Sequence, residues 1–381
     1  MKGRIAIAEP DLSGLEEEYA LAAIRSRWIS STGEFLDRFE REFAAACGGG
    51  EAIGVSNGTT AIHLALEALN VGPGDEVIVP SMTYIATANA VRYCGAEPVF
   101  VDVEPSTWCL EAARVEEAIT PRTKGIIAVH LLGHPADMDP LLDLAAIHGL
   151  WVVEDAAEAT FATYKGRTTG SLGRIGTFSF YGNKVLTCGE GGAVTFQDGS
   201  LATRLKMLRG QGMDPRRRYY FPIVGFNYRL TNVAAAILCA QLERREAIVG
   251  RRREIVALYE SRLRGVAGIT LRTDAPWAVT SPWMFSALVE QAPGVDRDGV
   301  ARRLGAEGVE TRPLFVPIHT LPPYRVDHAR RGGELPVTAR LGRDGLMLPT
   351  HTLLSDDDVH AVCDRLIAAV QAGRPGRLRA A

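Results

Sequence analysis

Residues 125–155 read GIIAVHLLGHPADMDPLLDLAAIHGLWVVED. Both ends of this stretch, GIIAVH (125–130) and LWVVED (150–155), are continuous apolar runs, and VIVP (77–80) and PVFVD (98–102) are two more. Segments with helical spacing alternate with these runs, for example at Ile62, Ala65, Leu66 and Leu69. Continuous apolar strands that alternate with helices predict a mainly parallel sheet covered on both faces.

The alternation continues along the chain and then becomes shorter. Strands are predicted at TFSF (177–180) and GGAVTF (191–196), long Arg/Glu-rich helices over about 228–265, a strand near 286–289, a helix near 297–307 and a last helix from about 355. We therefore predict an α/β fold with a large domain over residues 1–245 and a smaller C-terminal α/β domain over 246–381. The tail GRPGRLRAA is expected to be disordered.

Composition narrows the class of protein. The chain has 381 residues, is 46% hydrophobic and carries a formal net charge of −3, which favours neither nucleic acid nor an anionic membrane as a partner. No apolar run is long enough to span a bilayer, and the start MKGRIAIAEPDLSG becomes polar too early for a signal peptide. The six cysteines lack CxxC spacing. We expect a soluble, cytoplasmic protein without a structural metal.

One lysine stands out because of its surroundings. Lys184 is the single lysine in FSFYGNKVLTCGEGG (178–192), among aromatic and small residues. Its ammonium could extend outward and reach water. If it stays in a pocket, burial lowers its pKa and favours the neutral amine that a Schiff-base nucleophile needs.

Two further features lie where strands end. Asp155 closes the run LWVVED, and it could also be the N-cap of a helix over AAEA. Asn57, Gly58 and Thr59 directly precede a predicted helix, whose free N–H groups and dipole favour a phosphate, although Asn-Gly is also a common turn. Ligands of parallel sheets gather at the carboxyl ends of the strands, so these features are expected to meet.

Together these residues suit one cofactor, pyridoxal phosphate (PLP). PLP needs a lysine to bind it covalently, a carboxylate that keeps its ring nitrogen protonated and a cradle for its phosphate. Tyr84 follows a predicted strand and could stack on the ring. The order along the chain, with the phosphate loop first and then the aromatic residue, the aspartate and the lysine, strengthens the combination.

Two other groups of residues offer different interpretations. His130 and His134, with Asp137 and Asp139 close behind, could share a metal, but Gly133 and Pro135 break the helix that such spacing requires. We expect ring hydrogen bonds in an active-site loop instead. The basic run 216–218 could contact a nucleotide diphosphate or remain solvated, and the run 251–253 is predicted to be a surface.

With these residues in view, the chain resembles the fold-type I, PLP-dependent sugar aminotransferases of the DegT/StrS type. The resemblance runs from WISSTGEF (28–35) to LPTH (348–351), and it depends on five motifs: SNGTTAIHLAL, GDEVIVPSMTYIATANA, VEDAAEA, FSFYGNK and GEGGAV. Related dehydratases carry histidine at the position of Lys184, so lysine favours transamination.

The resemblance implies a role for each matching residue. Lys184 would bind PLP covalently, Asp155 would contact its ring nitrogen and Glu158 would lie near its phenolic oxygen. Gly58, Thr59 and Ser179 would hold the phosphate, and Asn227 would reach it from the neighbouring subunit of an obligate homodimer. Weaker expectations concern the sugar nucleotide, which would lie across the subunit junction near Trp28, Ser30, His134, Arg229 and His319.

The implied reaction moves an amino group from L-glutamate to a keto-sugar nucleotide. FSFYGNKVLTCGEGG, LRGQGMDPRRRYYFPIVGFNYRLTNVAAA and TRPLFVPIHTLPPY are most similar to the GDP-perosamine synthases of this family, which favours GDP-4-keto-6-deoxymannose as the acceptor. Other acceptors within the class are a 3-keto nucleotide sugar of the mycosamine type, another antibiotic sugar and a cyclitol ketone. A non-catalytic ligand sensor and a metal-dependent hydrolase built on the histidines are alternatives from other classes.

Overall fold

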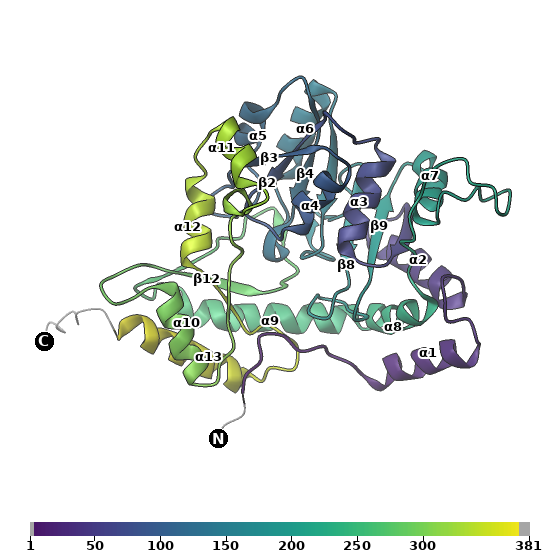
Figure 1. Cartoon of the computed structure of the whole chain (residues 1–381). Coiled ribbons are helices and arrows are strands. Elements are labelled where there is room, and N and C mark those ends of the chain that lie inside the picture. The colour runs from purple at the N-terminus through teal and green to yellow at the C-terminus, as the bar shows by residue number, and fades with distance from the viewer. Residues whose placement is uncertain (1–3, 373–381) are drawn as a thin grey trace, which may run out of the picture.

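Figure 1 shows the computed structural model of the chain, which describes residues 4–372. The tail GRPGRLRAA, predicted to be disordered, lies outside the described residues. None of the described helices combines the length and the apolar character that crossing a membrane requires.

A seven-stranded sheet forms the centre of the fold. Its order is β1 (Glu51–Val55), β9 (Gly192–Phe196), β8 (Ile175–Ser179), β5 (Trp151–Asp155), β4 (Thr123–Val129), β2 (Glu76–Pro80) and β3 (Glu97–Val101). The strands from β8 to β3 pair in parallel, whereas β9 is antiparallel to both of its neighbours. The predicted mainly parallel sheet is therefore confirmed, with β1 as a strand that the sequence pattern did not reveal.

Helices cover both faces of this sheet. Consecutive residues of β9 point into different core clusters, Ala193 towards α2 and α8 and Val194 towards α3 and α7, as the two-residue period of a strand requires. Burial on both faces explains why the strands are continuously apolar. The helices of this part are α1 (Gly14–Arg25), α2 (Glu34–Ala46), α3 (Gly58–Ala68), α4 (Ala86–Tyr93), α5 (Ala112–Ala118), α6 (Met138–His148), α7 (Ser200–Arg209) and α8 (Asn232–Glu243).

A second, antiparallel sheet follows, and its order is β10 (Ile269–Leu271), β12 (Phe285–Val289), β14 (Gly345–Leu348) and β13 (Arg312–Pro313). Its helices are α10 (Arg297–Ala306), α11 (Arg325–Arg331), α12 (Pro336–Asp344) and α13 (Asp356–Gln371). A small third sheet joins β11 (Ala278–Val279) to β6 (Thr163–Tyr164) and β7 (Arg167–Thr168).

The long helix α9 (Arg245–Leu263) connects the two main parts (Figure 1). Ile248 and Val249 near its start pack with α2 and α8, whereas Tyr259 and Leu263 near its end pack with the second sheet. At the opposite end of the chain, the Ile5 N–H donates to the carbonyl oxygen of Gly308 at 2.9 Å. Packing thus crosses residue 245 in both directions, and the division into domains 1–245 and 246–381 remains a proposal.

The residues 251–253 were predicted to lie on the surface, and this prediction is wrong for the middle residue, Arg252. Arg252 is buried, and its Nη1 donates to the carbonyl oxygens of Trp283 and Thr350, each at 2.9 Å. Burial lowers the pKa of this guanidinium to about 10. Arg252 therefore joins α9 to the segments that precede β12 and follow β14.

Candidate active site

A cavity of about 800 Å³ opens where the strands of the central sheet end. Its walls come from the start of α3, the segment after β2, the ends of β5 and β8, and the residues from Arg312 to Val316. This position is the carboxyl edge of the parallel strands, where ligands of such sheets bind. Seven of the eight residues predicted to bind the cofactor line the cavity: Gly58, Thr59, Tyr84, Asp155, Glu158, Ser179 and Lys184.

Buried Asp155 and Glu158 and the partly buried Lys184 form a group that we call the lysine cluster. The Lys184 Nζ lies 3.8 Å from Glu158 Oε1. Burial lowers the pKa of Lys184, and the carboxylates of Glu158 and Asp155 oppose this effect without cancelling it. The neutral form of this amine is therefore more accessible than that of a surface lysine, as a covalent nucleophile requires.

Asp155 is the last residue of β5, and its carboxylate points into the same space. The Thr87 hydroxyl donates to Oδ2 at 2.7 Å, and the Ala157 N–H donates to Oδ1 at 3.2 Å. Burial raises the pKa of Asp155. No helix begins after Asp155, so its alternative interpretation as the N-cap of a helix over AAEA is wrong. A buried carboxylate in this position instead favours a cationic partner within the cavity.

Glu158 completes the cluster from the turn after Asp155. Its Oε2 accepts the Leu132 N–H at 2.9 Å. Burial raises the pKa of Glu158 to about 7, although Lys184 acts in the opposite direction. Burial therefore disfavours the charged forms of both the lysine and the glutamate.

The start of α3 provides an anion site beside the lysine cluster. Asn57 caps the helix and, with Thr60, forms a capping box that uses the Thr60 N–H. The first N–H groups of a helix have no intrahelical acceptor, so those of Gly58 and Thr59 suit a phosphate. A Cβ on Gly58 would lie 2.7 Å from that of Ser179, so glycine is needed for this close approach. A largely enclosed lysine, a buried carboxylate and this cradle fit PLP.

Other lining residues were not anticipated from the sequence. Trp283, Phe315 and Arg312 line the cavity from the C-terminal part of the chain. The ring of Tyr84, which is 58% exposed, lies 6.0 Å from that of Phe315. The only sequence signal for Trp283 is a tryptophan directly before an apolar strand, a pattern that core residues share.

The two histidines of the alternative metal site are used in other ways. His130 accepts the Ala136 N–H at Nδ1 and donates from Nε2 to Glu154 at 2.9 Å. His134 donates from Nδ1 to the Pro135 carbonyl and accepts the Ala275 N–H at Nε2. All four ring nitrogens are engaged, so this pair forms no metal site. His134 is buried and is not among the residues lining the cavity, although it was expected to contact the sugar.

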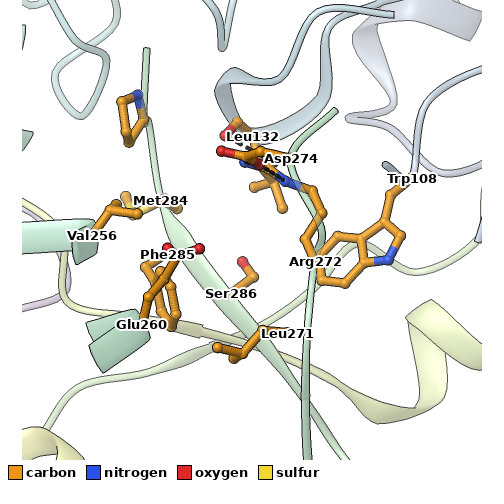
Figure 2. A pocket seen from close by; sticks show the side chains of 11 residues that line it. Trp108, Leu132, Val256, Glu260, Leu271, Arg272, Asp274, Met284, Phe285 and Ser286 are labelled. Atoms are coloured by element: carbon orange, nitrogen blue, oxygen red, sulfur yellow. Dashed lines mark hydrogen bonds and ion pairs between the residues drawn. The ribbon is translucent and has the colours of Figure 1, made fainter. Parts of the chain in front are cut away.

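A pocket of about 20 Å³ lies behind the Leu132 loop (Figure 2). Arg272 donates to the carbonyl oxygens of Leu131 and Leu132, each at 3.2 Å, and pairs with Asp274. Leu132 has a left-handed backbone, with φ of 53°, and its N–H is the one that reaches Glu158. The pocket holds no more than about one water molecule. Its lining stabilises the strained loop that contacts the lysine cluster.

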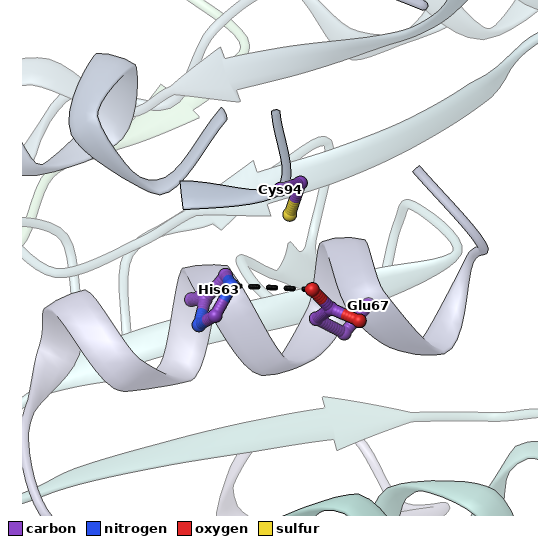
Figure 3. A group of neighbouring side chains, drawn as sticks. All are labelled: His63, Glu67 and Cys94. Atoms are coloured by element: carbon purple, nitrogen blue, oxygen red, sulfur yellow. Dashed lines mark ion pairs between the residues drawn. The ribbon is translucent and has the colours of Figure 1, made fainter. Parts of the chain in front are cut away.

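Figure 3 shows a cluster of His63, Glu67 and Cys94, whose potential ligand atoms lie within 4.8 Å of one another. His63 Nε2 is 3.3 Å from Glu67 Oε1, while Nδ1 is 3.0 Å from the Tyr228 hydroxyl. Burial raises the pKa of the Cys94 thiol to about 12, which disfavours the thiolate that a metal needs. The cluster therefore joins α3 to Tyr228, and we assign no metal to it.

Four predicted residues that we call the outer strip are Trp28, Ser30, Asn227 and Arg229, of which the first three are exposed and Arg229 is partly exposed. Trp28 is 60% exposed, and its carbonyl oxygen accepts from the Asn232 side chain at 2.7 Å. Arg229 donates to Asn227 Oδ1 at 2.9 Å. None of the four lines the cavity of a single chain. His319, which was also expected near the sugar, lies elsewhere, with its Nδ1 2.7 Å from the Ser81 hydroxyl.

Comparison with known proteins agrees with this geometry. The chain is 50% identical over 371 residues to the GDP-perosamine synthase of Caulobacter vibrioides, covering 96% of this chain and 97% of that protein. It is 43% identical over 336 residues to the dTDP-3-amino-3,4,6-trideoxy-alpha-D-glucose transaminase of Streptomyces venezuelae, covering 88% and 86%. The crystal structure of S. venezuelae DesV superposes with a TM-score of 0.88 at 40% identity, covering 95% of both chains.

The same conclusion follows from the family profile. The profile of the DegT/DnrJ/EryC1/StrS aminotransferases matches residues 10–367, which include both sheets and the whole cavity. Enzymes of this family are PLP-dependent sugar aminotransferases, and the lysine cluster beside a phosphate cradle fits that chemistry. The chain belongs to the DegT/DnrJ/EryC1/StrS aminotransferase family.

Proposed function

We propose that this enzyme transfers an amino group from L-glutamate to the 4-keto carbon of GDP-4-keto-6-deoxymannose, forming GDP-perosamine. The observation that carries the choice of substrate is the 50% identity to a GDP-perosamine synthase over nearly the whole of both chains. The buried lysine cluster supports the type of reaction, because it combines a nucleophilic amine with a carboxylate suited to a cationic ring. We place the reaction in the cytoplasm, where sugar nucleotides and L-glutamate are available.

The residues of the cavity would hold PLP in a defined orientation. Lys184 would bind it covalently, Asp155 would contact its ring nitrogen and Glu158 its phenolic oxygen. The start of α3 and Ser179 would bind the phosphate, and Tyr84 would cover the ring. When bound, PLP supplies an electron sink and carries the amino group between the two substrates.

The residues of the cluster then have separate tasks. With PLP and the donor amino acid bound, Lys184 would be a free amine that takes the proton of the donor α-carbon. The C–H bond would break, its electron pair would pass to the electron sink that PLP supplies, and an N–H bond would form at Nζ. Asp155 keeps the ring nitrogen protonated through a charge-assisted hydrogen bond worth roughly 1.5–3 kcal/mol. Burial of both groups favours the proton transfer, because little water competes for the proton.

We further propose a homodimer in which each cavity is completed by the outer strip of the partner subunit. Exposed Trp28 and Asn227, with Arg229 bound to Asn227, support this arrangement, because these side chains have no role in their own cavity. Asn227 would bind the phosphate of PLP across the interface, and Arg229 would contact the diphosphate or the sugar.

Mixed dimers test this arrangement. Subunits carrying Lys184→Ala are exchanged with subunits carrying Asn227→Asp, and activity is compared with that of each variant alone. If the lysine and the asparagine of one site come from different chains, a heterodimer has one intact site, so an equal mixture should recover about a quarter of the wild-type activity. Failure to recover, with subunit exchange shown by mass spectrometry, would mean that the lysine and the asparagine of each site come from the same chain.

The acceptor is tested by separating the two halves of the reaction. The PLP-loaded enzyme is treated with L-glutamate, freed of glutamate and then offered one keto-sugar nucleotide at a time. The visible absorption of the PLP form should return with GDP-4-keto-6-deoxymannose. Recovery only with a dTDP-linked 3-keto sugar would instead support the activity named for the S. venezuelae relative, and no recovery with either would refute both acceptors.

A further inference from the structure

An aromatic ring lies directly beside the amine of Lys184. Lys184 Nζ lies 3.8 Å from the centroid of the Trp283 ring, well within the distance of a cation–π contact. Trp283 lies two residues before the start of β12, is only 6% exposed and lines the cavity. Tryptophan has the strongest attraction for a cation among the aromatic side chains, and the attraction increases when water is excluded.

Independent contacts fix the position of this ring. The indole N–H donates to the carbonyl oxygen of Asn183, the residue before Lys184, at 2.9 Å. The Trp283 carbonyl oxygen accepts from buried Arg252 at 2.9 Å. The ring of Phe315 lies nearly parallel, at an angle of 14° and a centroid distance of 6.3 Å. Trp283 is therefore held by its indole to the residue before Lys184 and by its backbone carbonyl to α9.

We propose that Trp283 is a catalytic residue whose indole face orients the Lys184 amine and stabilises its protonated form. This inference rests on the proposed role of Lys184, but not on the identity of the sugar. During the reaction Lys184 gains a positive charge when it takes the proton of the donor. The ring can attract that charge without accepting the proton itself, because tryptophan has no basic group.

The indole supplies an attraction for the protonated amine that does not depend on the ionisation of the carboxylates. The charged or titratable side chains that share the cavity with Lys184 are Tyr84, Asp155, Glu158, Tyr181, Glu190 and Arg312. Asp155 is proposed to contact PLP, and Glu158 has a pKa of about 7, so its charge is only partly available near neutral pH. The Trp283 face is independent of pH and remains beside Nζ whether Glu158 is protonated or ionised.

The test measures protonation of Lys184 directly, in cofactor-free protein. Competitive acetylation with acetic anhydride is followed at Lys184 by peptide mass spectrometry from pH 6 to 11. The midpoint of the pH profile reports the pKa of the amine, whereas the plateau rate at high pH reports access to it. Wild type is compared with Trp283→Phe and Trp283→Leu, and Trp277→Leu is the control because Trp277 packs on Tyr164 and does not line the cavity.

We expect the midpoint to fall in the order wild type, Trp283→Phe, Trp283→Leu, with the leucine variant about one pH unit below wild type because a desolvated cation–π contact of this strength is lost. The control should match wild type. Equal midpoints, or a higher midpoint in the leucine variant, would overturn the proposal even if the plateau rates differ. The phenylalanine variant conserves shape well enough to decide the question if the leucine variant does not fold. A failed sugar assay would not affect this measurement.

Discussion

The lysine cluster and the outer strip both consist of predicted functional side chains, but they lie in different environments. In the cluster, burial lowers the pKa of Lys184 and raises the pKa values of Asp155 and Glu158, which favours the neutral form of each group. In the strip, Asn227 and Trp28 are exposed, and Arg229 binds a neighbouring amide. One chain therefore encloses the side chains of the lysine cluster, whereas it leaves those of the strip at least partly accessible. Substitutions should separate the two regions.

The largest effect is expected at the centre of the cluster. Lys184→Ala removes the covalent nucleophile and the base together and should reduce transamination by about 10,000-fold or more. Steady-state turnover measures this loss, and borohydride reduction followed by peptide mapping should find the cofactor on Lys184 in wild type. Exposed, ion-paired Lys165 is the control, and Lys165→Ala should remain active. An adduct mainly on another lysine would contradict the assignment.

Asp155→Asn should have the next largest effect. The amide cannot stabilise a protonated ring nitrogen, so both half-reactions should slow by about 100- to 1000-fold while PLP binding is largely kept. Stopped-flow absorption with L-glutamate measures the first half-reaction. Asp139→Asn changes a surface carboxylate and serves as the control. Near wild-type turnover of the Asp155 variant would contradict a role in the reaction, and Asp155 would then serve only to accept hydrogen bonds from Thr87 and Ala157.

A smaller and selective effect is expected in the outer strip. Arg229→Ala should slow transfer to the sugar nucleotide by about 10- to 100-fold, because a charge-assisted contact is lost, and should leave the glutamate half-reaction nearly unchanged. The two half-reactions are measured separately. Arg41→Ala, at another exposed arginine, is the control. Equal losses in both halves would mean that Arg229 belongs functionally to the cluster.

The smallest effect concerns stability and pH. Glu158 has a pKa of about 7 in the folded protein against an ordinary value of 4.5, so the folded state keeps a proton that the unfolded chain releases. Its contribution therefore becomes unfavourable as pH rises from about 4.5 to 7, by about 1–3 kcal/mol. Urea unfolding of the cofactor-free protein should show this loss in wild type and not in Glu158→Gln. The control variant Glu116→Gln, at an exposed position, should behave like wild type. Identical pH profiles for all three proteins would contradict the raised pKa of Glu158.

Much of this centre could be predicted because its parts are local in sequence. An apolar strand ending in Asp155, a capped helix start at Gly58 and a lone lysine in an aromatic segment are each visible within about ten residues. Parallel strands then bring their carboxyl ends to one edge of the sheet, where ligands of such sheets bind. The surface prediction for Arg252 failed because the charges of a helix do not reveal which of its faces another segment covers.

By itself, the sequence determined the alternating fold and predicted the lysine and the carboxylate that line one cavity, since these depend on short-range patterns. Only the tertiary structure decided that Trp283 covers Lys184, that His134 is enclosed away from the cavity and that Arg272 supports the Leu132 loop beside Glu158. Asn183 and Trp283 meet although they are 100 residues apart in the chain. Such contacts arise when separate strands and helices pack on one core, and no local pattern of side chains records which distant segment will lie opposite.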